Sequence, residues 1–241
     1  PVFAVLRQAV TRLVATKRPG DAIRAWAPGC ATGEEAYSIA IVLADVLGDH
    51  LAQFDVRVLA TDLDPDAIQT ARAGIYPRFA LENLDVALRE RYFVPQGPAL
   101  RVGRVIRERC VFALYDPMRQ PPLLNIDLVS CRNVPIHVRP DLHVEVLARF
   151  HHALNPGGYL LLDQSESAAT ASPLFEPVDE RYRLYRRCDV PSPSLLPSLQ
   201  SVPPSRPQQL PPGDNGHASS APDEIDKLRQ QIEALTRKGD L

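Results

Sequence analysis

The sequence is poor in cysteine and shows no metal-ligand pattern. It has 4 cysteines, at positions 30, 110, 131 and 188, among 241 residues. No two of them stand at the C-x-x-C spacing of zinc or redox sites, and the histidines show no metal spacing. We therefore predict four reduced thiols and no bound metal, as is usual in the cytoplasm, where disulfides are rare.

Strong charge and long apolar runs are also absent. The formal net charge is -2 at pH 7, so no basic surface predicts nucleic acid or an anionic membrane as a partner. No apolar run reaches the length of about 20 residues that spans a membrane, and no signal peptide leads the chain. We predict a cytoplasmic protein without membrane insertion. Because the sequence begins at Pro1 rather than Met, we interpret it as a piece of a longer protein.

Apolar residues make up 45% of the chain, which is enough for a sizeable core. Short apolar runs alternate with amphipathic stretches up to Arg187, and this alternation predicts a mostly parallel sheet with helices on both faces. The stretch at about 75–109 breaks the pattern and predicts a small antiparallel excursion. The predicted strands are 22–27, 56–61, 110–114, 126–131 and 159–163, the predicted helices are 34–47, 64–74 and 139–154, and 175–178 with 182–186 predict a terminal hairpin.

The composition changes after Arg187. Nine prolines fall between Pro191 and Pro222 among Ser, Gln and Gly, which predicts a disordered linker over 188–222. Apolar residues then return at a and d spacing over 223–241, and this pattern predicts the start of a coiled-coil helix through which the protein would dimerise.

The stretch "RAWAPGCATGEEAYSIAIVL", residues 24–43, contains a glycine turn between a predicted strand and a predicted helix. Its G-x-x-x-G spacing matches neither the dinucleotide pattern nor the phosphate-binding loop, which also needs a lysine. Glu34 and Glu35 at the helix start disfavour an anion and suit cationic groups. Asp62 ends the next strand, where a carboxylate can accept ribose hydroxyls. These features together predict S-adenosylmethionine, a nucleoside with a positively charged amino-acid tail.

Structural alternatives stay open for both acids. Thr32 and Glu35 also form the T-x-x-E pattern of a capping box, in which Glu35 would only satisfy amides at the helix start. Asp62 would likewise serve only to cap the turn that follows it.

Four motifs, "GCATGEEAYSIAI", "ATDLDPDAIQTARAGIYP", "DLVSCRN" and "LNPGGYLLLDQSES", resemble the CheR family of S-adenosylmethionine-dependent protein-glutamate O-methyltransferases of bacterial chemotaxis. The resemblance covers about Phe3 to Arg187. It implies an α/β fold with a Rossmann-like methyltransferase sheet over 1–187, and a small antiparallel β-subdomain at about 75–109 that docks receptors. The linker and the coiled-coil start resemble the segments that connect such domains to downstream sensor or kinase domains in fused proteins.

The resemblance also implies the site. The backbone around Ala27 to Gly29, with Thr32 and Glu35, would line the methionine end of the cofactor, and Asp62 would bind its ribose. The remaining cofactor-binding residues implied are Asp116 and Pro117 at the adenine and Arg132 and Asn133 beneath the reacting end. A glutamate acceptor with a pKa of about 4.3 is already ionised, so the reaction needs alignment and water exclusion rather than a general base. The implied partners are cytoplasmic helices of chemoreceptors or a receptor-like signalling protein.

The sequence departs from the family at three places. The family's Ser/Thr-x-Phe-Phe-Arg stretch would lie before Pro1, Asp116 replaces an asparagine, and His137 stands where the family has a tyrosine near the methyl group. Arg132 and His137 are the candidate catalytic residues. Arg132 would position the acceptor carboxylate or form a structural ion pair, and His137 would act near the methyl group or only fill the tyrosine's space.

Two hypotheses follow. The first is a protein-glutamate O-methyltransferase. The second is a catalytically weak module that binds the cofactor or a receptor and regulates a fused domain. The glycine spacing argues against a nicotinamide enzyme.

Overall fold

A computed structural model describes residues 2–132, 140–163 and 173–193 of the chain. A central sheet has the strand order β6-β2-β1-β7-β8-β10-β9, with the first five strands parallel and β10 antiparallel to both of its neighbours. The strands are β1 (Ala22–Pro28), β2 (Asp55–Asp62), β6 (Cys110–Leu114), β7 (Ile126–Cys131), β8 (Leu154–Leu162), β9 (Phe175–Asp179) and β10 (Leu184–Arg187). The chain builds outward from β1 on one side and then returns to add β7 on the other, so β1 and β7 flank the switch point where open α/β sheets bind ligands.

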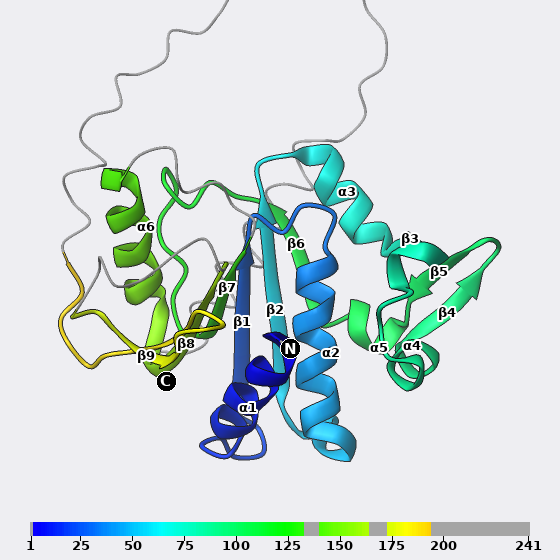
Figure 1. Ribbon diagram of the computed structural model, residues 1–241, viewed down its shortest axis with the longest axis horizontal. Coiled ribbons are helices and arrows are strands. Elements are labelled where there is room, and N and C mark those ends of the chain that lie inside the picture. The colour runs from blue at the N-terminus through cyan, green and yellow to red at the C-terminus, as the bar shows by residue number, and fades with distance from the viewer. Residues whose placement is uncertain (1, 133–139, 164–172, 194–241) are drawn as a thin grey trace, which may run out of the picture.

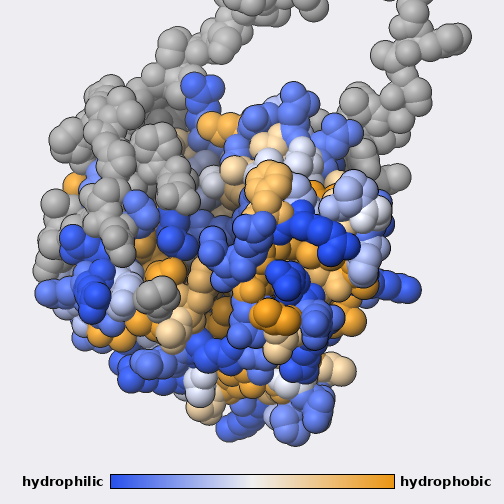
Figure 2. Space-filling model, turned by 45° about the vertical axis from the view of Figure 1, so that its right-hand side comes forward, coloured by the Kyte–Doolittle hydropathy of each residue, from blue (hydrophilic) through white to orange (hydrophobic). Residues whose placement is uncertain are grey.

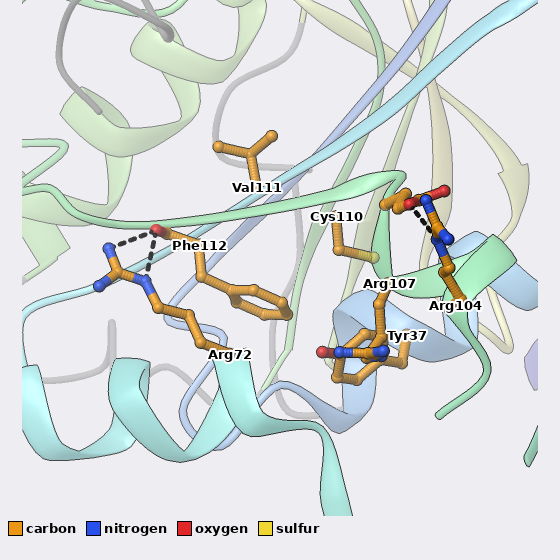
Figure 3. Close-up of a pocket in the computed structure, with 8 residues that line it drawn as sticks. Tyr37, Arg72, Arg104, Arg107, Cys110, Val111 and Phe112 are labelled. Carbon is orange, nitrogen blue, oxygen red and sulfur yellow. Dashed lines mark hydrogen bonds and ion pairs between the residues drawn. The ribbon is translucent and has the colours of Figure 1, made fainter. Parts of the chain in front are cut away.

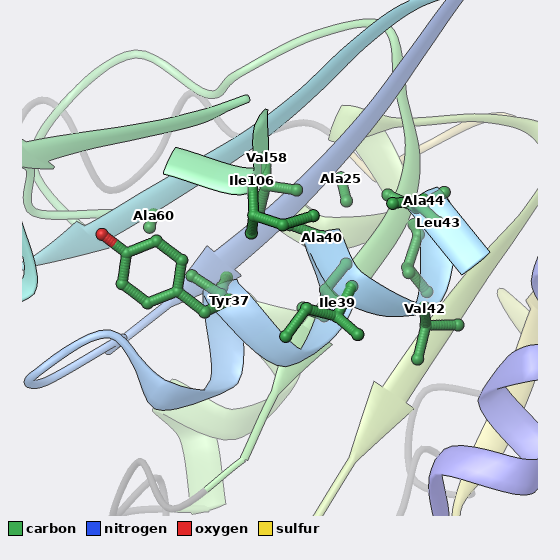
Figure 4. Close-up of a cluster of buried hydrophobic side chains, with 14 of the residues drawn as sticks. Ala25, Tyr37, Ile39, Ala40, Val42, Leu43, Ala44, Val58, Ala60 and Ile106 are labelled. Atoms are coloured by element: carbon green, nitrogen blue, oxygen red, sulfur yellow. The ribbon is translucent and has the colours of Figure 1, made fainter. Parts of the chain in front are cut away.

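Helices cover both faces of this sheet, as the alternation of strands and helices predicts (Figure 1). They are α1 (Val2–Val14), α2 (Glu34–Leu47), α3 (Pro65–Ala73) and α6 (Pro140–Ala153), with a 3-10 turn η1 (Gly48–Gln53) after α2. Alternate residues of β1 point to opposite sides, because side chains alternate along a strand. Ala25 joins the core under α1 and α2, whereas Trp26 joins the core under α6. Figure 4 shows the first of these cores, where Ile39 and Leu43 of α2 lie close to the sheet.

The predicted antiparallel excursion is a β-subdomain that projects from the sheet edge beyond α2 and α3 (Figure 1). Its strands are β3 (Ile75–Pro77), β4 (Phe93–Gln96) and β5 (Ala99–Val102), paired antiparallel in the order β3-β5-β4. It also contains η2 (Arg78–Leu81), α4 (Val86–Tyr92) and α5 (Arg104–Arg107). Figure 2 turns this side toward the viewer and shows patches of hydrophobic surface between hydrophilic side chains.

Two elements differ from the sequence prediction. The helix α1 is not among the predicted elements, although Leu6, Ala9, Val10 and Leu13 are buried at helical spacing. The helix α6 ends at Ala153, close to its predicted end, but 155–158 form a bulge inside β8, which begins before the predicted strand 159–163. The pairing with β7 jumps there from Ile126↔Leu154 to Leu128↔Tyr159. A side chain at Gly158 would place its Cβ 2.9 Å from the Asn155 carbonyl oxygen, which explains the glycine there.

The start of the predicted linker packs on the domain. His151 of α6 is fully buried, and its Nε2 donates to the Cys188 carbonyl at 3.1 Å, because a carbonyl can only accept. Its Nδ1 then accepts a hydrogen bond from the Ser192 hydroxyl at 2.8 Å. The packed part of the chain therefore continues past Arg187 to Ser192. The predicted coiled-coil start at 223–241 and the linker after residue 193 lie outside the described residues. In the described ranges, no helix has the length and apolar character needed to cross a membrane.

Candidate active site

The glycine turn after β1 is tied to the neighbouring strands. Cys30 donates its backbone N–H to the Thr61 carbonyl at 3.0 Å, and the hydroxyl of Tyr76 in β3 donates to the Thr32 carbonyl at 2.7 Å. Gly29, Ala31 and Gly33 all have positive φ, at 67°, 44° and 95°. The turn is therefore a fixed loop between β1 and α2 rather than a flexible connection.

Gly33 is required by close packing as well as by its backbone conformation. A Cβ there would lie 2.9 Å from the Ala71 Cβ and 3.1 Å from the ring of Phe112. Only glycine combines a φ of +95° with this approach of α3 and β6. Ala71 and Phe112 consequently occupy the space that a side chain at position 33 would need.

The alternative in which Thr32 and Glu35 form a capping box is wrong. Gly33 is the N-cap of α2, and no side chain accepts a hydrogen bond there. The Thr32 hydroxyl donates to the Glu34 carboxylate at 2.7 Å instead. The carboxylate of Glu35 accepts a hydrogen bond from the hydroxyl of Ser130, a buried residue of β7. Glu35 is thus directed across the switch point, and Ser130 is a site residue that the sequence reasoning missed.

The environment of Glu35 brings the pKa of its carboxyl close to neutral pH. Burial raises the pKa of the Glu35 carboxyl from 4.5 to about 7, although the Ser130 hydrogen bond and the charge of Arg132 lower it, and Asp163 raises it. A cationic ligand beside this carboxyl would favour the ionised form. The site therefore suits the positively charged end of S-adenosylmethionine.

Asp62 ends β2 with its carboxylate partly occupied. One oxygen accepts the N–H groups of Leu63 at 2.7 Å and Asp64 at 3.0 Å, and the other accepts from Ala31 at 2.8 Å. The alternative role in the following turn is therefore real. A carboxylate offers about four acceptor positions, so about one remains for a ligand hydroxyl.

The segment after β6, which was predicted to face the adenine, lies beside the end of β2. Tyr115 donates its backbone N–H to the Asp62 carbonyl at 3.1 Å, which places Asp116 and Pro117 next to the end of β2. The Asp116 carboxylate accepts from the Met118 N–H at 2.8 Å. Leu63, 68% exposed, and Leu114, 38% exposed, offer apolar surface beside Asp62. The sequence analysis singled out neither residue, although Leu63 was recognisable as a large apolar residue directly after an acid at a strand end.

The remaining predicted residues are placed less completely. Arg132 follows β7, and its guanidinium carbon lies 5.9 Å from the centre of the Phe3 ring. Ala27 is fully buried within β1, so its side chain belongs to the core. Asn133 and His137 lie outside the described residues. The structure thus brings Thr32, Glu35, Asp62, Asp116 and Arg132 to one edge of the sheet, at the carboxyl ends of β1, β2, β6 and β7.

Comparison with protein families identifies the family of the chain. Residues 1–184 match the family described as CheR methyltransferase, SAM binding domain. The chain belongs to the CheR family. The predicted Rossmann-like sheet, the small antiparallel β-subdomain and S-adenosylmethionine as cofactor are confirmed by this membership and by the fold.

Relatives of the chain include named chemotaxis methyltransferases. A chemotaxis protein methyltransferase of Escherichia coli is 35% identical over 159 residues, which cover 64% of this chain and 54% of that protein. One of Pseudomonas putida is 32% identical over 170 residues, covering 68% and 62%. An uncharacterised 104.1 kDa protein of Rhodobacter capsulatus is 35% identical over 185 residues, covering 76% of this chain and 19% of that protein. The CheR domain described here therefore spans less than two thirds of each of these relatives.

Proposed function

We propose that this CheR domain transfers a methyl group from S-adenosylmethionine to glutamate side chains of chemoreceptor helices or of a receptor-like signalling protein. The observation that carries the proposal is the hydrogen bond from Ser130 to Glu35, which holds an ionisable carboxyl across the switch point. The names of the chemotaxis relatives support the reaction class.

The residues present fit the cofactor. Two carboxylates, Glu35 and Asp62, lie on either side of the glycine turn, and exposed Leu63 and Leu114 flank Asp62. This set suits a ligand with an ammonium group, ribose hydroxyls and an apolar flat base. We propose that Glu35 binds the ammonium group, Asp62 the ribose, and the segment at Asp116 and Pro117 the adenine.

The chemistry then rests on orientation. Bound S-adenosylmethionine supplies a methyl group on a positively charged sulfur, which makes that carbon electrophilic. The acceptor carboxylate, with a pKa of about 4.3, is already a nucleophile at neutral pH. We propose that Arg132, supported by the Phe3 ring, orients the acceptor carboxylate, and that Asn133 and His137 line the same end of the site. Catalysis would come mainly from alignment and from the exclusion of water.

The β-subdomain is the proposed docking surface for the substrate protein. It exposes Phe79, Val86 and Val94, of which Phe79 is 72% exposed. Exposed apolar side chains on a projecting subdomain are typical of protein contacts.

A second candidate is a cofactor-binding module that regulates a larger protein and transfers methyl groups slowly or not at all. The Rhodobacter relative favours this candidate, because the match covers only 19% of its length. In such a protein, the region after residue 193 would connect the domain to others, and 223–241 would support dimerisation.

One experiment separates the two candidates. The full-length protein is incubated with S-adenosylmethionine labelled in its methyl group and with the cytoplasmic fragment of a chemoreceptor from the same organism. Methylation of glutamate gives label that alkali releases as methanol and that disappears when the acceptor glutamates are changed to glutamine. No transfer with intact binding of S-adenosylhomocysteine favours the regulatory module, and no binding overturns both candidates.

A further inference from the structure

A hollow lies beside the edge strand β6, on the other side of Phe112 from the glycine turn. It measures about 390 Å³ and lies between α3, α5 and the edge strand β6 (Figure 3). The residues that line it are Tyr37, Arg72, Arg104, Arg107, Glu108, Cys110, Val111 and Phe112. Its volume falls within the range of about 300 to 1,000 Å³ that is usual for small-molecule sites.

Two guanidinium groups in this hollow are held by neutral partners. Arg72 donates from Nε and Nη2 to the Phe112 carbonyl at 3.3 and 3.0 Å, and Arg107 donates from Nε to the Val102 carbonyl at 3.0 Å. Among the residues that the structure describes, neither arginine forms an ion pair. Both side chains are therefore oriented by backbone carbonyls rather than by carboxylates, and Arg72 is at an exposed position.

The lining carries a positive excess. Glu108 is its only carboxylate, and Glu108 pairs with the exposed Arg104 at 2.5 Å. Arg72 and Arg107 add two further cations, and although the charge of Arg107 helps to lower the pKa of Glu108, the lining keeps a net positive charge. Because backbone carbonyls already orient these two side chains, an anion that bound them would lose less free energy to side-chain ordering.

The hollow is separate from the proposed cofactor site. The rings of Phe112 and Tyr37, with centres 5.2 Å apart, lie between the hollow and the glycine turn. One edge of the Phe112 ring lies 3.1 Å from the position of a Cβ on Gly33. A ligand in the hollow would thus be separated from the glycine turn by the rings of Phe112 and Tyr37.

We infer that this hollow binds a small molecule with two or more phosphate groups. Guanidinium groups match phosphate oxygens in geometry and charge. Arg72 and Arg107 come from different elements and approach from opposite sides of Phe112 (Figure 3). Two linked anionic groups therefore satisfy both cations better than one, and the site is independent of the proposed methyl transfer.

The test is calorimetric titration of the full chain with inorganic pyrophosphate at constant ionic strength, with S-adenosylhomocysteine at saturation to fill the cofactor site. We expect saturable binding of one pyrophosphate, and weaker binding of monophosphate and of succinate, which separates phosphate from carboxylate chemistry. Arg72→Gln and Arg107→Gln should each weaken binding by about tenfold, the effect of losing one charge-assisted hydrogen bond.

Two further variants keep the test decisive. Glu108→Gln removes the only carboxylate of the lining, and because Glu108 is exposed, this variant should fold even if the arginine variants fold poorly. It should strengthen pyrophosphate binding. Arg78→Gln changes an exposed arginine of the same subdomain outside the hollow and should leave binding unchanged. Loss of binding when S-adenosylhomocysteine is added, or equal effects of Arg78→Gln and Arg107→Gln, would overturn the assignment.

Discussion

The hydroxyl of Ser130 in β7 donates a hydrogen bond to the carboxylate of Glu35 in α2, across 95 positions of sequence. This contact ties the start of α2, the helix that follows β1, to the neighbouring strand β7 at the switch point. It fixes the direction of the Glu35 side chain at the carboxyl end of β7, where Arg132 follows the strand. The geometry of the proposed cofactor site therefore depends on a contact that only the assembled sheet provides.

Gly33→Ala should destabilise the domain and abolish cofactor binding. The new Cβ would lie 2.9 Å from the Ala71 Cβ, and alanine at a φ of +95° is strained by about 1 to 3 kcal/mol even in open space. Gly20→Ala is the matched control, since Gly20 has the same φ and nothing within 4 Å of the added atom. Thermal denaturation and titration with S-adenosylhomocysteine should show a larger loss for Gly33→Ala. Equal losses would mean that packing against α3 is unimportant.

Asp62→Ala should weaken S-adenosylhomocysteine binding by about 1 to 3 kcal/mol, the size of losing charge-assisted hydrogen bonds. Part of this loss would come from the turn, because Asp62 also holds the Ala31 N–H at 2.8 Å. Asp62→Asn removes the charge and keeps one oxygen, which can accept from the Leu63 and Asp64 N–H groups, but it sets an NH2 group against the Ala31 N–H. Titration calorimetry should therefore give an intermediate affinity for the asparagine variant. Unchanged binding in Asp62→Ala would refute the ribose assignment.

The regular elements of this fold were predictable because their signals are local. The pattern over 34–47 predicts a helix with the bounds that α2 has, and Asp64 caps α3 through the N–H groups of Asp66 and Ala67, as predicted. The mostly parallel sheet with helices on both faces followed from the same alternation, whereas the order of the strands is known only from the structure. The position of the turn, and of Asp62 at the end of the next strand, could therefore be found from the sequence alone.

The orientation of Glu35 was not predictable in the same way. The T-x-x-E pattern is a local signal for a capping box, but the Glu35 carboxylate instead accepts a hydrogen bond from Ser130. Ser130 lies close to Glu35 only because β7 is the neighbour of β1 in the sheet. The bulge at 155–158 is likewise set by a distant group, since Asn155 donates to the buried carboxylate of Asp127 at 2.8 Å. Long-range hydrogen bonds of this kind do not appear as a periodic pattern in the sequence.

Truncation should distinguish the two parts of the tail. Removal of 194–241 should leave the melting temperature nearly unchanged, because the composition of that region predicts no core. Removal of 188–241 should lower it by several degrees, since His151 loses both ring partners and Val190 leaves the core under α6. Equal melting temperatures for the two truncations would show that the contacts of Ser192 contribute nothing.

Cofactor affinity should rise with pH across neutrality. The pKa of Glu35 is about 7 in the free protein, and an ammonium group beside it favours the carboxylate, so binding should release a proton below that pH. Titration of S-adenosylhomocysteine between pH 6 and 8.5 should show this rise in the wild type. Glu35→Gln should bind more weakly and show a flatter profile over this range. A variant profile as steep as that of the wild type would assign the pH dependence to another group.

Glu35→Gln should also change how stability depends on pH in the absence of cofactor. Below pH 4.5 the carboxyl is protonated in the folded and unfolded states alike, so the wild type and the variant should differ little. Because burial raises the folded pKa from 4.5 to about 7, the wild type loses stability as the pH rises through this window. Above this window, the variant should be more stable by about 1 to 2 kcal/mol. This is less than about 1.36 kcal/mol for every pKa unit of the shift would give, because the half-buried carboxylate keeps some contact with solvent. Urea denaturation at pH 4.5, 6 and 8 measures the difference. A constant difference across the three pH values would mean that Glu35 is not the group whose proton the fold retains.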